Sequence, residues 1–406
     1  MKVYVGIDWS DRKHDVFVVD ESGRKIGYFE IEHSQTGFEQ LEKWREKAGL
    51  LREECKVGLE TAHNLLLDFL WGTGYTDIYV VPPNIVDASR PRYRQGGAHN
   101  DKSDAYTIAD LLRTDGHRFV SWHPGSELLQ QMRAAVSSAR FYTKHSVAVA
   151  NRLQASLKRY HPRVLKVFTN WPSPIACHLI KAYPTPQHLQ TLTYEEFTGF
   201  LKAHRHTKPS KWLEYYDLLK ASAPVPTPAT VHAYQHEVVQ LADLLLNSLD
   251  LEKQTLAQLQ TLFRNHEDAP IFDSLPGAGE LLAPSLLVKF GEDRQRFSQP
   301  GALQALAGTA PVTKQSGGRY SVHFRRACDK DFRYFMQQFA RCSLPNSPWA
   351  AAYFHNATQR GLAPSHAYRC LANRWIVIIW RLWQDRTTYD EAYHIQRRSE
   401  RRAPKS

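Results

Sequence analysis

The chain has 406 residues, 42% of them hydrophobic, so it is long enough for two or three domains with sizeable cores. Its 52 Lys and Arg against 41 Asp and Glu give a formal charge of +11, which favours a polyanionic partner, nucleic acid being the default candidate. The five cysteines lack CxxC spacing, which argues against zinc ribbons and disulfide frameworks and fits a reducing cytoplasm.

The first 124 residues predict a mixed α/β domain. Three strands in hairpin order are followed by alternating helices and strands, which is the element order of ribonuclease H-like folds. The expected strands are 2–8, 15–20, 25–32, 56–60 and 77–83, and the expected helices are 36–48, 63–74 and 103–113. This likeness is at the level of the fold and does not by itself define a function.

Acidic residues stand where three of these elements meet. Asp8 is the last residue of the first strand and Glu60 the last of the fourth. In this plan the two strands are neighbours with their C-terminal ends on one edge, and Asp101 and Asp104 begin a helix that can pack against it. Four like charges in one place repel unless divalent cations offset them, and carboxylate oxygens select Mg²⁺ or Mn²⁺.

Each acid also has an ordinary explanation. Asp101 and Asp104 suit the first turn of any helix, because the helix dipole favours negative charge there. Asp11, Asp15 and Asp20 are further acids in the same region, but only Asp8 ends the central apolar strand. Two metal ions at such a site would act on a phosphodiester, in agreement with the basic charge of the chain.

The region 125–268 predicts two long helices with apolar residues at heptad spacing, at about 125–160 and 229–265. An antiparallel coiled coil and plain core-facing stripes explain the spacing equally well. The Pro-rich insertion 163–227 predicts short helices joined by loops, and its sequence indicates no role.

After residue 269 the pattern is mainly helical, with helices expected after the glycine turn of 274–291 and at 297–308, 329–343, 347–359 and 364–384. The most apolar run, WIVIIWRLW at 375–383, is too short for a membrane span and predicts a buried helix. The segment 309–327 predicts a loop rich in small and basic residues. The segment 386–406 is a basic tail, and its last ten residues, RRSERRAPKS at 397–406, predict disorder.

Several of these motifs together resemble one insertion-sequence transposase family, numbered one-ten, which also includes the pilin-gene invertases. GIDWSDRKHDV (6–16), GLETAH (58–63) and NDKSDA (100–105) resemble its DEDD motif. SLPGAGELLA, ALAGTAPVTKQSGGR and DKDFRYFMQQFA resemble its second domain. The resemblance covers both ends of the chain in the same order, and the combination is more specific than any single motif.

The resemblance implies a RuvC-like DEDD catalytic domain at 1–124, a helical coiled-coil region at 125–268 and a C-terminal transposase domain at 269–385. It implies a site-specific recombinase acting on double-stranded target and donor DNA in a bacterial or archaeal cytoplasm, without a membrane. Carried over by position, Asp8, Glu60, Asp101 and Asp104 would hold Mg²⁺ or Mn²⁺, and Ser316 would form a transient phosphoserine link. Some members use a structured bridge RNA as a guide, and strand exchange favours a homodimer or homotetramer.

The residues around Ser316 suit contact with nucleic acid, although a flexible surface loop explains them too. Gly317 and Gly318 allow backbone N–H groups to approach a phosphate, and cationic side chains lie nearby in the sequence. LPGAG at 275–279 resembles the hairpin of a helix-hairpin-helix, which contacts phosphates through glycine N–H groups. The candidate nucleic-acid contacts are Gly277, Gly279, Lys314, Gly317, Gly318, Arg319, Arg325 and Arg326.

Two other functions remain open at this point. A metal-dependent nuclease or Holliday-junction resolvase would use water as nucleophile and leave Ser316 structural. A non-catalytic nucleic-acid-binding protein would use neither the acids nor the serine. His63, beside the Glu60 motif, is a further residue that a metal site there can include.

Overall fold

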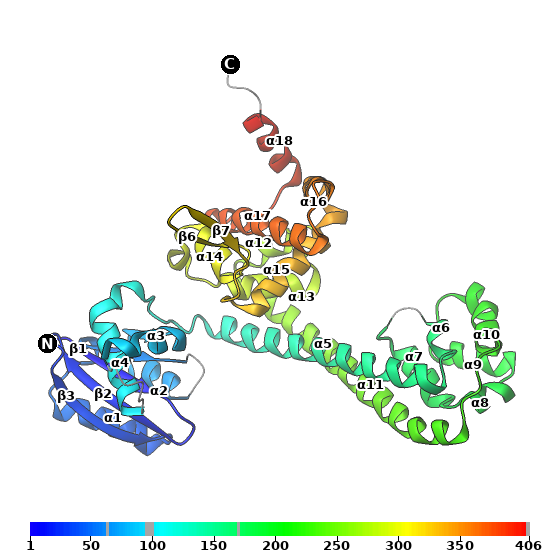
Figure 1. Ribbon diagram of the computed structural model, residues 1–406, viewed down its shortest axis with the longest axis horizontal. Coiled ribbons are helices and arrows are strands. Elements are labelled where there is room, and N and C mark those ends of the chain that lie inside the picture. Colours follow the sequence, from blue (N-terminus) through cyan, green and yellow to red (C-terminus); the bar gives the residue numbers. More distant parts are fainter. Residues whose placement is uncertain (62–64, 94–100, 169–170, 403–406) are drawn as a thin grey trace. The chain divides into compact units, whose positions relative to one another are not determined.

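Five strands near the N-terminus form one mixed sheet in this computed structural model, which describes residues 1–61, 65–93, 101–168 and 171–402. The chain divides into two units, Met1–Pro124 and Gly125–Ser406 (Figure 1). His63 lies outside the described residues. Among the described helices, none combines the length and apolarity that crossing a membrane requires.

The sheet has the order β3-β2-β1-β4-β5. Its strand β2 is antiparallel to both neighbours, whereas β1, β4 and β5 are parallel. The predicted mixed sheet is therefore confirmed, with β1 at its centre. The strands are β1 Val3–Asp8, β2 Lys13–Asp20, β3 Lys25–Glu32, β4 Cys55–Leu59 and β5 Ile78–Val80.

Helix α4, Asp101–Asp115, packs across β1, β2 and β4, and two glycines make this packing close. Gly6 and Gly58 are paired across β1 and β4. A Cβ atom on Gly6 would lie 2.0 Å from the carbonyl oxygen of Ala105, so the helix backbone rests directly on the strand. The other helices of this unit are α1 Gln35–Lys47, α2 Leu65–Thr73 and α3 Pro83–Tyr93.

Two long antiparallel helices, α5 Glu127–Tyr160 and α11 Pro228–Arg264, begin the second unit (Figure 1). Their direction follows from hydrogen bonds that join Thr143 to Glu252 at 2.7 Å and Ser156 to Glu237 at 3.1 Å. The Pro-rich insertion between them folds into short helices, and these share a core with α5 and α11 that includes Leu153 and Leu245. They are α6 Val164–Val167, α7 Pro174–Ala182, α8 Pro186–Thr191, α9 Tyr194–Ala203 and α10 Trp212–Lys220.

The C-terminal helices bury a core that also includes Leu129 and Met132 of α5 and Phe263 of α11. The helical region and the C-terminal region therefore share a core across residue 268. The predicted buried helix at 375–383 is confirmed as part of α17. The elements are α12 Ala269–Asp273, α13 Gly279–Phe290, α14 Pro300–Leu306, β6 Val312–Ser316, β7 Arg319–His323, α15 Lys330–Ser343, α16 Pro348–Gln359, α17 Pro364–Asp385 and α18 Glu391–Arg402.

Two predictions for this region were wrong. The segment 309–327 is not only a loop, because β6 and β7 form a hairpin within it. The disorder predicted for 397–406 is wrong for residues 397–402, which belong to α18. The start of that helix is fixed by Glu391, which accepts hydrogen bonds from the hydroxyls of Ser347 at 3.2 Å and Tyr389 at 2.6 Å.

Candidate active site

Asp8 and Glu60 lie on one edge of the sheet because their strands are parallel neighbours. Asp8 is the last residue of β1, and Glu60 directly follows Leu59, which pairs with Ile7. Parallel strands bring their C-terminal ends to the same edge. Neither carboxylate has a strand residue beyond it, so both mark the point where the sheet ends.

Helix α4 brings two more carboxylates to this edge. Gly6 lies under Ala105 and Ala109, whereas Gly58 lies under Ile108 and Leu112, which orients the helix across the sheet. The charges of Asp101 and Asp104 act on Asp8, so the first turn of α4 lies near the end of β1 that carries Asp8. Within that turn Asp101 is exposed, and Asp104 is only 8% exposed.

The electrostatics show that the four acids act on one another. Burial, followed by the charges of Glu60, Asp104 and Asp101, raises the pKa of Asp8 to about 7. Burial and the charge of Asp104 likewise raise the pKa of Glu60, against the opposing charge of Arg90. The structure thus brings together all four predicted acids in a place with excess negative charge.

Arg90 of α3 is a member of this cluster that the sequence did not reveal. Its Nε donates to Oδ1 of Asp104 at 3.1 Å, and its Nη2 donates to Oδ2 at 2.8 Å. Its Nη1 lies 2.6 Å from Asp87. Helix α3 was not predicted, because its first residue, Pro83, was assigned to the end of a strand and Pro91 lies inside the helix. The partner of Arg90 depends on how that helix packs.

Most of the other acids in this region have structural roles. Asp20 accepts hydrogen bonds from the backbone N–H groups of Ser22 and Arg24 in the turn after β2. Asp110 accepts from Arg113 and from the hydroxyl of Tyr93.

Asp15 remains close to the site. It pairs with Asp8 across the sheet, and it accepts a 2.6 Å hydrogen bond from the hydroxyl of Tyr28. Its negative charge contributes to the raised pKa of Asp8.

The donor chemistry at this edge suits a divalent cation. Mg²⁺ and Mn²⁺ prefer hard carboxylate oxygens. Burial and then the neighbouring carboxylates raise the pKa of Asp8, and a bound cation would offset the repulsion among these carboxylates. Within the described part of the chain, no three His, Cys, Asp or Glu side chains are gathered closely enough to hold one ion as they stand. The oxygens are therefore near one another without forming a closed ligand shell.

Ser316 lies in the second unit, at the end of β6. It pairs with Arg319 across a turn of two glycines, and Gly317 adopts a φ of 55°, which favours glycine. Strand alternation puts Lys314 and Ser321 on the same face of the hairpin as Ser316. All residues of the hairpin except Val312 are exposed.

Among the other candidate nucleic-acid contacts, Gly277 and Arg325 have a role in the fold, whereas Gly279 does not contact a neighbour that would exclude a side chain. Gly277, with a φ of 78°, is required by the fold itself, since a Cβ there would lie 2.2 Å from the carbonyl oxygen of Cys342. Gly279 has open space around it. Arg325 donates to the carbonyl of Ala310 at 3.3 Å, which fixes the base of the hairpin.

The hairpin also contains a Ser–His pair that the sequence pattern did not reveal. Oγ of Ser321 lies 2.9 Å from Nε2 of His323, on the face that carries Ser316. A hydroxyl next to an imidazole is a possible nucleophile and base. The signal was a serine and a histidine two residues apart, which only a strand brings to one face.

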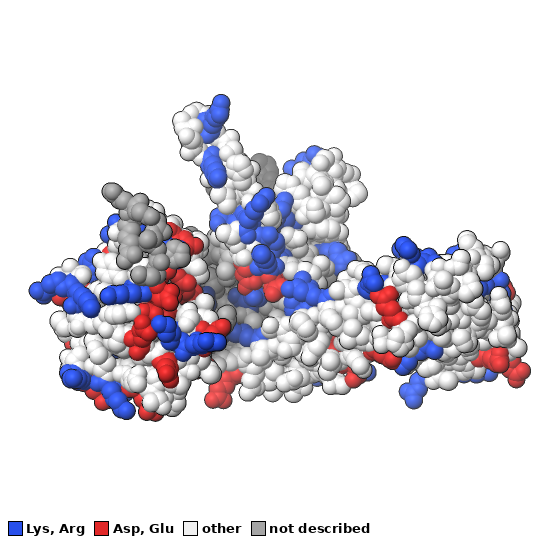
Figure 2. All heavy atoms as spheres, turned by 60° about the horizontal axis from the view of Figure 1, so that its bottom comes forward, with Lys and Arg blue, Asp and Glu red and all other residues white. Residues whose placement is uncertain are grey.

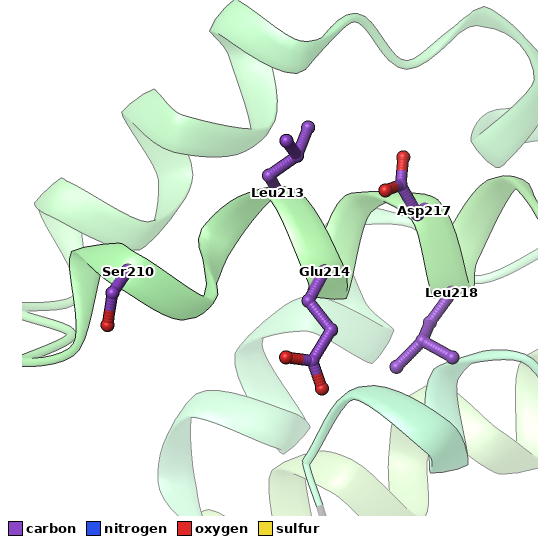
Figure 3. Close-up of a pocket in the computed structure, with 5 residues that line it drawn as sticks. All are labelled: Ser210, Leu213, Glu214, Asp217 and Leu218. Carbon is purple, nitrogen blue, oxygen red and sulfur yellow. The ribbon is translucent and has the colours of Figure 1, made fainter.

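A pocket in the second unit lacks a comparable constellation (Figure 3). The side chains of Glu214 and Leu218 extend from one side of α10, and those of Leu213 and Asp217 from the other. Glu214 is paired with Lys211 at 2.7 Å. These groups do not converge on one point, so the pocket is not a candidate for the chemistry.

A mixed sheet of this order, with acids at the ends of its two central parallel strands and on the helix that covers them, defines a ribonuclease H-like enzyme domain. Figure 2 shows acidic side chains gathered on one face of that unit, with basic side chains around them. The comparisons with known proteins make the assignment more specific.

The profile of the DEDD transposases of IS110 type matches residues 5–162, and that described as "Transposase IS116/IS110/IS902 family" matches residues 269–355. The IS117 mini-circle protein of Streptomyces coelicolor is 28% identical over 402 residues, 96% of each chain. The IS900 42 kDa protein of Mycobacterium paratuberculosis is 26% identical over 347 residues, 81% of this chain and 82% of the relative. The chain belongs to the IS110 family of insertion-sequence transposases, enzymes that cleave and transfer DNA.

Proposed function

We propose that this transposase cuts and rejoins DNA through Ser316, with divalent cations held by Asp8, Glu60, Asp101 and Asp104. The observation that carries the proposal is the convergence of four carboxylates at the ends of β1 and β4 and the start of α4, where burial and the neighbouring charges raise the pKa of Asp8 to about 7. Such a concentration of negative charge destabilises the fold unless a bound cation offsets the repulsion. A phosphate bridged by cations is the ligand that fits both the acids and the reaction class.

The four carboxylates would hold the cations at a fixed place at the edge of the sheet. Mg²⁺ or Mn²⁺, when bound, supplies Lewis acidity that stabilises negative charge on the oxygens of a phosphodiester. Asp8 and Glu60 extend from the ends of two central strands, so their oxygens are held by the sheet rather than by a loop. Asp104 is held by the packing of α4 on Gly6. The fold thus organises the ligands before the substrate binds.

The serine step balances without an external energy source. A bond forms between Oγ of Ser316 and the scissile phosphorus as the bond from phosphorus to a sugar oxygen breaks. The hydroxyl proton of Ser316 leaves, and the released sugar oxygen ends as a hydroxyl. Attack by a hydroxyl of another DNA strand then reverses the chemistry. One phosphoester bond is conserved throughout, so ATP is not needed.

The hairpin supplies charge and access for this step. Lys314 and Arg319 lie on the face of Ser316, where a cationic field lowers the pKa of a hydroxyl and attracts a phosphate. Gly317 and Gly318 leave backbone N–H groups accessible at the tip. Arg325 and Arg326 continue the positive charge toward the base of the hairpin.

We extend the proposal to a guide RNA and to a homodimer or homotetramer. The support for RNA is the basic and aromatic surface of α5, where Phe141 is 62% exposed and stacks on His145 with a centroid distance of 6.0 Å. The support for an oligomer is chemical, since exchanging strands between two duplexes needs several active sites. Purification from cells that carry the flanking DNA, followed by sequencing of bound RNA, tests the guide: one discrete species supports it, and random fragments contradict it.

Replacement of Ser316 tests the nucleophile. Ser316→Ala is expected to abolish the covalent protein–DNA adduct seen on a denaturing gel with duplexes carrying the element ends. Ser321→Ala is the matched variant, because it removes a hydroxyl from the same face of the same hairpin. Loss of the adduct in Ser321→Ala alone would transfer the nucleophile to the Ser321–His323 pair.

The same variants separate the two other functions. A nuclease that uses water would keep cleaving DNA after Ser316→Ala. A protein that only binds nucleic acid would keep every measurable activity after Asp8→Ala or Glu60→Ala. The proposed function requires both acid variants to lose cleavage while still binding DNA.

A further inference from the structure

Arg90 already occupies the acidic edge as a cation of the chain itself. Its guanidinium contacts both oxygens of Asp104, the geometry in which an Arg–carboxylate pair is strongest. The Asp104 side chain is 11% exposed and that of Arg90 35% exposed, so solvent screens this pair less than a surface pair. The positive charge of Arg90 also acts on Glu60: it lowers the pKa of that carboxyl, against burial and the charge of Asp104, which raise it.

Arg90 has a second carboxylate within reach. Its Nη1 lies 2.6 Å from Oδ1 of Asp87, one turn earlier on α3. The Asp87 side chain is 62% exposed, so it lies at the solvent side of the pair. Arg90 can therefore release Asp104 without becoming an unpaired charge, because Asp87 retains it.

We infer that Arg90 is a positioning residue that holds Asp104 in the metal-free enzyme and transfers to Asp87 when a divalent cation binds. The inference rests on the proposed function, in which Asp104 is a metal ligand. The pairing of Asp104 with Arg90 explains why the four acids are near enough to interact and yet do not surround one point. A cation at Asp104 and the Arg90 guanidinium repel each other, so the two compete for that carboxylate.

The experiment is a titration of the full-length, metal-free protein with Mn²⁺, followed by electron paramagnetic resonance of the free ion at low ionic strength. Arg90→Gln is expected to bind Mn²⁺ roughly tenfold more tightly than the wild type, because the competitor is gone. Asp87→Asn is expected to bind Mn²⁺ several-fold more weakly, because Arg90 loses its alternative partner. Opposite signs from two neighbouring variants are not expected of a merely structural role.

Arg92→Gln is the matched control. It removes the same charge from the same helix, but Arg92 faces Thr114 and Asp115 rather than the acidic edge. Its Mn²⁺ affinity is expected to equal that of the wild type. Melting curves add a second readout. Without metal, Arg90→Gln is expected to melt at a lower temperature than the wild type, and Mn²⁺ is expected to raise its melting temperature more than that of the wild type.

The outcomes separate the two proposals. Wild-type protein that binds Mn²⁺, together with Arg90→Gln that binds it equally or more weakly, overturns the role of Arg90 and leaves the metal site standing. Should Arg90→Gln misfold, Asp87→Asn decides alone, and unchanged or tighter binding overturns the transfer. Wild-type protein that binds no Mn²⁺ overturns the metal site and the role of Arg90 together.

Discussion

Asp8 shows what the acidic edge costs the protein. Its pKa is about 7 instead of the ordinary value of 3.8, mainly because of burial and next because of the neighbouring carboxylates. The folded protein thus binds this proton more tightly than the unfolded chain does. Asp8 imposes no penalty below pH 4, and its contribution to stability falls as pH rises from about 4 to about 7.

We therefore expect the metal-free protein to melt at a higher temperature at pH 5 than at pH 8. Asp8→Asn should remove part of this difference and raise the free energy of unfolding at pH 8 by on the order of 2 kcal/mol, discounted because Asp8 is partly exposed. Calorimetry with a chelator present measures both effects.

Added Mg²⁺ serves as the control for this prediction, because a bound cation offsets the repulsion. It should raise the melting temperature of the wild type at pH 8 more than that of Asp8→Asn. A wild-type melting temperature that rises from pH 5 to pH 8 without metal, with Asp8→Asn following the same curve, would contradict the account.

At the scale of residues, the acidic members of the candidate site could be predicted from the sequence, whereas the basic residues that contact it or lie in the hairpin could not. Asp8 and Glu60 were identifiable because each ends an apolar strand, and parallel neighbours must bring such residues to one edge. Arg90 was not identifiable, since its partner depends on the packing of a helix that contains an internal proline. The close pairing of Ser321 with His323 was equally hidden, because a polar, exposed hairpin lacks the apolar alternation that predicts strands.

At the scale of elements, the position of α4 depends on two residues without side chains. A Cβ on Gly6 would lie 2.0 Å from the carbonyl oxygen of Ala105 and 2.5 Å from the amide nitrogen of Ala109. Backbone atoms cannot turn away as a flexible side chain can, so the helix itself must move. Any such movement displaces Asp101 and Asp104 relative to Asp8.

Gly6→Ala is accordingly expected to destabilise the protein by roughly 1–3 kcal/mol, the range for overpacking a core. Cleavage should be lost to a greater extent than this destabilisation explains, because a catalytic site tolerates little displacement. Urea denaturation and a cleavage assay at a temperature where the variant remains folded measure the two effects separately.

Gly72→Ala is the control for this change. Gly72 lies in α2, where an added Cβ meets nothing within 4 Å, so the substitution should be neutral or stabilise by up to about 1 kcal/mol. A Gly6→Ala protein with wild-type stability and cleavage would show that α4 does not need this contact.

The same scale shows why some elements could be predicted and others not. Strands β1 to β3 and helices α5, α11 and α17 carry strong apolar patterns, and their predicted positions agree with the structure to within a few residues. The β6–β7 hairpin is polar and α18 is highly charged, so neither carries a pattern of burial. Contacts distant in sequence, such as Glu391 with Ser347, set the start of α18.

At the scale of the whole molecule, the two groups of proposed catalytic residues belong to units with their own cores. The acidic edge belongs to Met1–Pro124, and the Ser316 hairpin belongs to Gly125–Ser406. Their cores are distinct sets of buried residues. Composition predicted several domains and a basic charge, but residues 129–136 and 259–263 contribute to the C-terminal core, which no change in composition marks.

The net charge of +11 predicts that DNA binding depends strongly on salt, because each phosphate contact releases counterions. Part of this charge lies at the C-terminus, where residues 397–406 contain five Lys and Arg and one Glu. Charges of this kind contribute affinity that does not depend on DNA sequence.

Deletion of residues 397–406 should weaken binding to any duplex and reduce the slope of log affinity against log salt by roughly 0.9 for each DNA phosphate that the tail neutralises. Fluorescence anisotropy between 50 and about 200 mM salt measures this slope. The deletion leaves Tyr389 and Glu391, which anchor the start of α18, so the fold should persist. An unchanged slope with intact folding would mean that these charges do not reach DNA, and that the cations facing the phosphates come from residues before 397.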